Sequence, residues 1–173
     1  MADAQTETVY WTLLEHEPWQ LYLAATEMGL CYVGSQAAPL GELEEWVKKK
    51  IPQAELVESR EKLQSYEAEL IEYLTGRRRE FTIPLDLRGT EFQQKVWDEL
   101  LKVPFGSSAT YTEIAERIGR PDAIRAVGTA IGANPVLIPV PCHRMFGKHG
   151  EWRGYRGGLP MKKELLELEG MLE

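Results

Sequence analysis

Short runs of aromatic, β-branched and leucine residues alternate with turn-forming residues over the first 35 positions. The runs are VYWTLL (9–14), WQLYLAAT (19–26) and GLCYVGS (29–35), and they are separated by EHEP and EMG. Apolar runs bounded by turn signals are typical of strands. The pattern therefore predicts a small antiparallel sheet, with Cys31 in its third strand as a buried structural thiol.

Apolar residues change to a helical spacing after residue 39. PLGELEEWVKKKIP (39–52) predicts a short helix, and SREKLQSYEAELIEYLTG (59–76) predicts a longer one that ends at Gly76. The stretch FTIPLDLRG (81–89) then connects to a second unit. We expect one domain over residues 1–87, an α/β roll, and another over residues 88–173.

The second half of the chain shows helix-start signals in a row. Thr90 with Gln93 and Thr110 with Glu113 fit capping boxes. RPDAIRAVGTAIG (120–132) predicts a further helix with Pro121 in its first turn and Ile124 on its buried face. Two short helices around a glycine turn predict a helix-turn-helix, whose second helix carries small residues that allow close approach to a partner: Ala123, Ala126, Gly128 and Ala130. The fold class that follows is α+β, a small sheet with helices followed by a helical domain.

Composition places the chain among ordinary globular proteins. It has 173 residues, of which 43% are hydrophobic and 27% charged, and no window approaches the ~20 apolar residues of a membrane span. The N-terminal residues show no signal peptide, so we expect a cytoplasmic protein with no membrane partner. The two cysteines and three histidines are too scattered for a zinc site. We predict no metal and no cofactor, and a monomer by default.

The net charge of −7 argues at first against nucleic acid as a partner. The charge is uneven, however. Residues 1–85 hold 8 basic and 15 acidic residues, whereas the window 117–156 holds seven basic and two acidic residues, a local charge of +5. This window surrounds Cys142, so a local basic patch favours an anionic partner near that residue.

Cys142 lies in an unusual frame, IPVPCHRM (138–145). Pro135, Pro139 and Pro141 predict an extended segment that cannot be helical, and its apolar residues predict burial. His143 and Arg144 follow at once, and a nearby base or cation activates a thiol as a nucleophile. The frame favours chemistry at Cys142 over simple packing.

Five motifs in the same order resemble the O6-alkylguanine-DNA alkyltransferases, the methylated-DNA–protein-cysteine methyltransferases. They are GTEFQQKVWDELLKVPFG, TYTEIAERIG, AIRAVGTAIGANP, PCHR and GYRGGL, and the resemblance covers residues 88–170 closely and the N-terminal region in outline. It implies a ribonuclease H-like roll followed by a winged helix-turn-helix. It also implies DNA repair by a single, irreversible transfer of the alkyl group of O6-methylguanine to the protein's own cysteine.

The resemblance assigns the catalytic roles by position. Cys142 is similar to the methyl acceptor, His143 to the base that takes its proton through a water, and Glu169 to the carboxylate that orients that histidine. Asn134 resembles the hinge asparagine beside the active-site turn. Tyr111 resembles the tyrosine that crowds the target phosphate and donates a hydrogen bond to the departing guanine.

The resemblance also implies how DNA is held. Arg125 is similar to the arginine that fills the gap left by a flipped nucleotide in duplex DNA approached from the minor groove, and the small residues 123, 126, 128 and 130 suit close approach. Met145, Tyr155 and Arg156 match the pocket for the base. Relatives often carry a small residue at the position of Arg156, so its side chain is a candidate phosphate contact.

Two other functions are consistent with parts of the pattern. One is a non-catalytic protein that binds alkylated bases on the same fold, against which the presence of Cys142 counts. The other is a thiol hydrolase that uses Cys142, His143 and Glu169, which leaves the helix-turn-helix unexplained.

Overall fold

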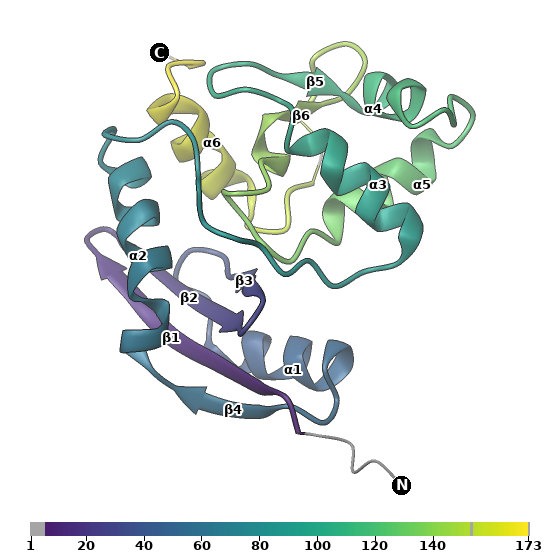
Figure 1. The fold of residues 1–173 in the computed structure, drawn as a ribbon. Coiled ribbons are helices and arrows are strands. Elements are labelled where there is room, and N and C mark those ends of the chain that lie inside the picture. The colour runs from purple at the N-terminus through teal and green to yellow at the C-terminus, as the bar shows by residue number, and fades with distance from the viewer. Residues whose placement is uncertain (1–5, 153, 173) are drawn as a thin grey trace, which may run out of the picture. The chain divides into compact units, whose positions relative to one another are not determined.

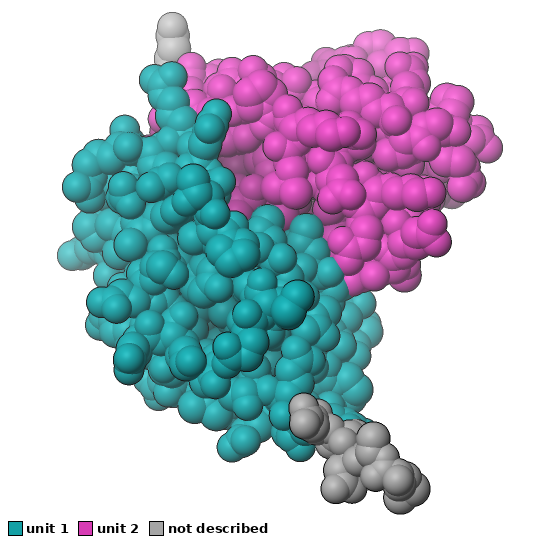
Figure 2. Space-filling view, viewed as in Figure 1, with its two compact units in different colours: residues 1–88 teal, residues 89–173 magenta. Residues whose placement is uncertain are grey.

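The computed structural model describes residues 6–152 and 154–172, which form two compact units divided between Arg88 and Gly89. Figure 2 colours the two units separately. Within the described residues, no helix is both long and apolar enough to cross a membrane. The α+β class expected from the sequence is confirmed by the elements of the two units.

The first unit is built on a four-stranded sheet. Strands β1 (Thr8–His16), β2 (Trp19–Thr26) and β3 (Gly29–Val33) form the antiparallel meander that the sequence predicted. A fourth strand, β4 (Glu55–Glu58), pairs in parallel with β1 and gives the order β3-β2-β1-β4 (Figure 1). Strand β4 was not predicted, because its four residues, ELVE, carry too little alternation to signal a strand.

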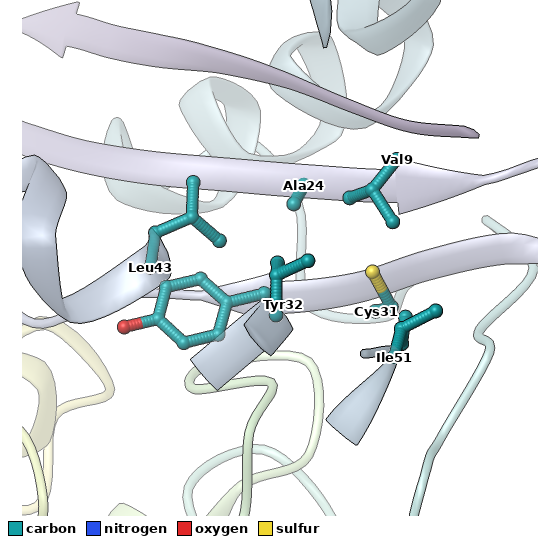
Figure 3. Close-up of a cluster of buried hydrophobic side chains, with 7 residues drawn as sticks. Val9, Ala24, Cys31, Tyr32, Leu43 and Ile51 are labelled. Atoms are coloured by element: carbon teal, nitrogen blue, oxygen red, sulfur yellow. The ribbon is translucent and has the colours of Figure 1, made fainter. Parts of the chain in front are cut away.

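Two helices cover opposite faces of this sheet. Helix α1 (Leu40–Lys50) packs on the face of Val9 in the buried cluster of Figure 3, and helix α2 (Arg60–Leu74) brings Lys62 over the ring of Tyr10, the next residue along β1. Successive side chains of a strand point to opposite faces. Cys31 lies in the α1-side cluster, and burial raises the pKa of its thiol to about 12, as befits a structural cysteine.

The described residues of the second unit form four α-helices and a short strand pair, besides one turn of 3₁₀ helix. They are α3 (Glu91–Leu100), α4 (Tyr111–Arg117), α5 (Ile124–Gly132) and α6 (Leu159–Leu168), with β5 (Ala109–Thr110) parallel to β6 (Met145–Phe146). Both predicted capping boxes are confirmed, at the starts of α3 and α4. The Trp97 indole N–H donates to the carbonyl of Ala130 at 2.9 Å, which fixes α3 against α5.

The start of α5 differs from the sequence prediction. Pro121 was placed in its first turn, but it lies in a turn before the helix, where the Ala123 N–H donates to the Arg120 carbonyl at 2.9 Å. Proline suits the second position of such a turn as well as a helix start. Ile124 was expected on the buried face and is instead 42% exposed, where it lines a surface groove.

Candidate active site

The segment that leads to Cys142 is buried, as predicted. Val136, Leu137, Ile138 and Val140 are at most 1% exposed. The prediction that residues 135–141 are extended throughout was wrong, because the chain reverses at Ile138, and the Val140 N–H donates to the Val136 carbonyl at 3.2 Å. Prolines exclude a helix but not a turn. Ile138 has a φ of 79°, a strained conformation for a β-branched residue that surrounding packing must hold in place.

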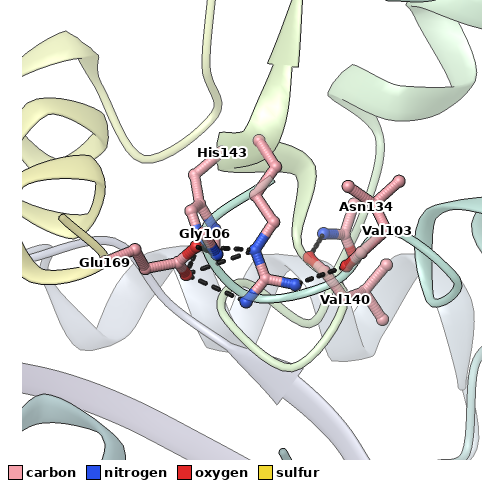
Figure 4. Close-up of polar contacts among 7 residues, drawn as sticks. Val103, Gly106, Asn134, Val140, His143 and Glu169 are labelled. Atoms are coloured by element: carbon pink, nitrogen blue, oxygen red, sulfur yellow. Dashed lines mark hydrogen bonds and ion pairs between the residues drawn. The ribbon is translucent and has the colours of Figure 1, made fainter. Parts of the chain in front are cut away.

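Asn134 connects the start of this segment to its end. Its amide Nδ2 donates to the Val140 carbonyl at 2.9 Å and to Cys142 Sγ at 3.2 Å, while its Oδ1 accepts from the Val136 N–H at 2.9 Å. Figure 4 shows this side chain directed at Val140. One buried carboxamide thus fixes both the turn and the thiol.

Cys142 begins a single turn of 3₁₀ helix, Cys142–Arg144, immediately after Pro141. The thiol is buried, with only 5% of the residue exposed. Burial raises the pKa of Cys142, and the hydrogen bond from Asn134 and the charges of Arg156 and Lys162 oppose that shift. A thiol whose pKa is raised stays protonated at neutral pH, so it needs a base when it reacts.

His143 and Glu169 form a buried pair next to the thiol residue. The His143 Nε2 atom lies 2.7 Å from Glu169 Oε2, and both side chains are fully buried. Burial lowers the pKa of His143, against the opposing effect of Glu169, so the imidazole is neutral at pH 7. The Glu169 carboxylate accepts a hydrogen bond from the Nε2–H of the neutral ring, which leaves Nδ1 as the basic nitrogen.

Arg144 balances the charge of Glu169. Its Nε and Nη2 atoms donate to the carboxylate at 2.9 Å each, and its Nη1 donates to the Val103 carbonyl at 2.6 Å (Figure 4). The Gly106 N–H donates to Glu169 Oε1 at 3.0 Å. The sequence offered Arg144 as a cation near the thiol, whereas in the structure its guanidinium holds the carboxylate that bonds His143.

Lys162 is a buried cation of the second unit that was not among the predicted site residues. It is 1% exposed, its Nζ donates to the Met145 carbonyl at 2.6 Å, and it lies over the rings of Phe146 and Trp152 at 4.7 and 5.5 Å. Burial lowers its pKa to about 8. A signal was present, because position 162 falls on the helical stripe of 165, 166 and 169, where a lysine among buried residues is unusual.

Tyr111 and Arg125 line a groove whose lining residues do not include the members of the thiol network. Ile124, Gly128 and Lys148 also line it, and its volume is about 680 Å³. A Cβ atom at Gly128 would lie 3.8 Å from the Tyr111 ring, an ordinary van der Waals distance, so α5 passes close to that ring at this glycine. Ala123, Ala126 and Ala130 line a neighbouring hollow with Arg125, and Ala130 is the buried one of the three.

The basic window is less of a surface patch than its charge implied. Arg144 and Arg156 both turn inward, onto Glu169 and onto backbone carbonyls. Arg117 lies 3.5 Å from Glu113 and Arg120 lies 4.0 Å from Asp122, while Arg125 and Lys148 line the groove. Arg153 lies outside the described residues.

The remaining pocket residues are buried. Met145 is 0% exposed and pairs with Ala109 between β6 and β5, and Tyr155 is 8% exposed. In residues 6–152 and 154–172, no group of three or more histidine, cysteine or acidic side chains could hold a metal ion. The site therefore presents a thiol, a neutral imidazole and a carboxylate clamped by an arginine.

Known proteins match both units. The family "6-O-methylguanine DNA methyltransferase, DNA binding domain" matches residues 91–171, and its "ribonuclease-like domain" matches residues 9–87. The inducible methylated-DNA–protein-cysteine methyltransferase of Bacillus subtilis is 51% identical over 162 residues, which cover 94% of this chain and 90% of that protein.

Solved structures agree with these sequence matches. The Mycobacterium tuberculosis O6-methylguanine methyltransferase superimposes with a TM-score of 0.78 at 37% identity, covering 93% of this chain and 92% of that one. The Mycobacterium tuberculosis OGT in complex with DNA gives a TM-score of 0.77 at 36% identity, covering 94% and 92%.

Proposed function

Because this chain belongs to the 6-O-methylguanine DNA methyltransferase family, it repairs DNA by transferring an alkyl group to one of its own cysteines, and we propose that the acceptor is Cys142. The observation that carries this assignment is the network around the thiol. Asn134 donates a hydrogen bond to Cys142 Sγ at 3.2 Å. His143, the residue after Cys142, forms a hydrogen bond with Glu169 at 2.7 Å. Cys31, the other cysteine, is a packing residue of the first unit.

The proposed reaction uses these groups in one displacement. The Cys142 sulfur bonds to the methyl carbon, the bond between that carbon and O6 breaks, and the electron pair stays on guanine. The thiol proton passes through a water to Nδ1 of His143. The imidazole can accept this proton because it is neutral. Tyr111, which lines the groove, donates a hydrogen bond to the departing guanine. The thioether that forms has no hydrolytic exit, so each molecule acts once.

The groove at α5 is the proposed site of DNA contact. The helices α4 and α5 form the helix-turn-helix, and exposed small residues such as Ala126 let α5 enter the minor groove closely. The methyl carbon is out of reach inside a base stack, so the nucleotide flips out.

Duplex DNA that carries radiolabelled O6-methylguanine tests this function. We expect the label to move to the protein in a 1:1 ratio and then to stop. Label that stays on the DNA despite tight binding would support a non-catalytic binder. Repeated turnover of an ester or amide would support a thiol hydrolase.

Replacing Arg125 with alanine is expected to slow repair of duplex DNA by roughly tenfold to a hundredfold, because unstacking a base costs a few kcal/mol that an inserted side chain offsets. Reaction with the free methylated base should be unchanged, since no stack has to open. Arg117→Ala removes the same charge from α4 and should affect neither rate. Equal losses on the two substrates in the Arg125 variant would rule out a role in flipping.

The monomeric state and the cytoplasmic location stay predictions from composition.

A further inference from the structure

Arg156 is half-buried, and its guanidinium donates to backbone carbonyls of its own chain. The sequence suggested a phosphate contact for this side chain, but its Nε donates to the Asn134 carbonyl at 2.8 Å and its Nη2 to the Pro135 carbonyl at 3.1 Å. Both carbonyls lie at the start of the segment that ends in Cys142. The planar guanidinium can reach two neighbouring acceptors at once, which an ammonium group cannot do with the same geometry.

The stretch that carries Arg156 is packed tightly against the same segment. A Cβ atom at Gly157 would lie 2.6 Å from the Tyr155 ring, 2.7 Å from Met161 Sδ and 3.2 Å from Leu137 Cδ1. The Gly158 N–H donates to the Tyr155 carbonyl at 2.8 Å and closes a turn over residues 155–158. This turn contacts Leu137 by packing, and Arg156 adds a polar connection to it.

Asn134 extends this connection to the thiol. Arg156 holds the backbone carbonyl of Asn134, and the side chain of Asn134 holds the Val140 carbonyl and Cys142 Sγ. A continuous chain of hydrogen bonds therefore runs from the 155–158 turn to the sulfur. A shift of the turn would be transmitted to the nucleophile through two residues.

We propose that Arg156 is a positioning residue, which ties the 155–158 turn to Asn134 and so aims Cys142 at the base held against that turn. This rests on the proposed role of Cys142 as acceptor. The charge of Arg156 also favours reaction at the thiol, because it lowers the pKa of Cys142 against the effect of burial. The proposal predicts that Arg156 affects the chemistry of the thiol and not the attraction of the protein to DNA.

Three variants separate these effects. Arg156→Met removes the charge and both hydrogen bonds but keeps an apolar stem, and Arg156→Lys keeps the charge without the paired donors. Lys163→Met is the matched control, because Lys163 is an exposed cation on α6 that lies 3.9 Å from Glu167. Three quantities are measured for each: the rate of methyl transfer, the pH dependence of Cys142 alkylation by iodoacetamide, and the salt dependence of affinity for undamaged duplex DNA.

Arg156→Met is expected to slow transfer from duplex DNA and from the free methylated base by the same factor, on the order of tenfold to a hundredfold, because a displaced nucleophile loses alignment. The pH at which the thiol becomes reactive should move upward, since the removed cation lowered the pKa of Cys142. Arg156→Lys should keep that pH dependence near the original while its transfer rate still falls. Lys163→Met should leave all three measurements unchanged.

A phosphate contact would give the opposite pattern. The slope of log affinity against log salt would fall by about one, and reaction with the free base would be unaffected. That result, or unchanged thiol reactivity in Arg156→Met, would overturn the proposal. The unmodified protein is assayed alongside the variants. If it transfers label in a 1:1 ratio, the proposed function holds whatever the Arg156 variants show. Arg156→Lys provides the test if Arg156→Met does not fold.

Discussion

Replacement of Cys142 with alanine is expected to reduce methyl transfer to the protein below detection, the largest effect of any single substitution. No other group in the network can take the alkyl group and keep it, since the proposed thioether needs the Cys142 sulfur. The fold should survive, because Asn134 Nδ2 retains the Val140 carbonyl as acceptor and only one small side-chain atom is lost. The measurement is label transfer from duplex DNA, with circular dichroism and DNA affinity as checks that the variant is folded and binds.

The second cysteine is the matched control. Cys31→Ala removes a thiol of the same size from the buried cluster of the first unit, where burial raises the pKa of the thiol to about 12 and keeps it unreactive. Transfer should stay at the level of the unmodified protein, although the cavity costs stability. Label that reaches the Cys142→Ala variant, or transfer lost in Cys31→Ala, would move the acceptor away from Cys142. Cys142→Ser, which keeps a hydrogen-bond acceptor for Asn134, should be as inactive as the alanine variant.

Local signals in the sequence predicted much of the fold. The capping boxes at Thr90 and Thr110 and the three strands of the first unit are coded by neighbouring residues, so they could be read without a structure. Strand β4 could not, because its identity depends on its partner β1, whose paired residues lie 47 positions earlier in the chain. The start of α5 also depended on context, since Pro121 suits a turn and a helix start equally.

The site divides in the same way. Cys142 and His143 stood out because their types and neighbours already indicate chemistry. The hydrogen bonds of Arg144 and Arg156 to groups inside the protein could not be predicted, because an arginine in a sequence indicates surface charge unless its acceptors are known. Those acceptors are Glu169, 25 residues away from Arg144, and the backbone carbonyls at 134 and 135. Only the folded chain brings them within reach.

Replacing Glu169 with glutamine is expected to lower the free energy of unfolding by about 3–5 kcal/mol, because the buried charge of Arg144 loses its partner. Methyl transfer should also fall, by about a hundredfold or more, because His143 loses the carboxylate that orients it and raises its pKa. The sign of the pH effect follows. With Glu169 removed, the pKa of His143 drops further, so the acid limb of the rate profile should move to lower pH. Chemical denaturation and label transfer, each followed against pH, measure these effects.

A second substitution separates the two losses in this variant. Arg144→Met combined with Glu169→Gln removes the stranded charge together with its partner, so part of the lost stability should return. The transfer rate should not return, because His143 still lacks its carboxylate. Glu167→Gln is the control, a change of the same charge at an exposed position on α6 that should alter neither quantity. If the double variant recovered its transfer rate together with its stability, Glu169 would act only as the partner of Arg144. His143 would then accept the thiol proton without help from Glu169.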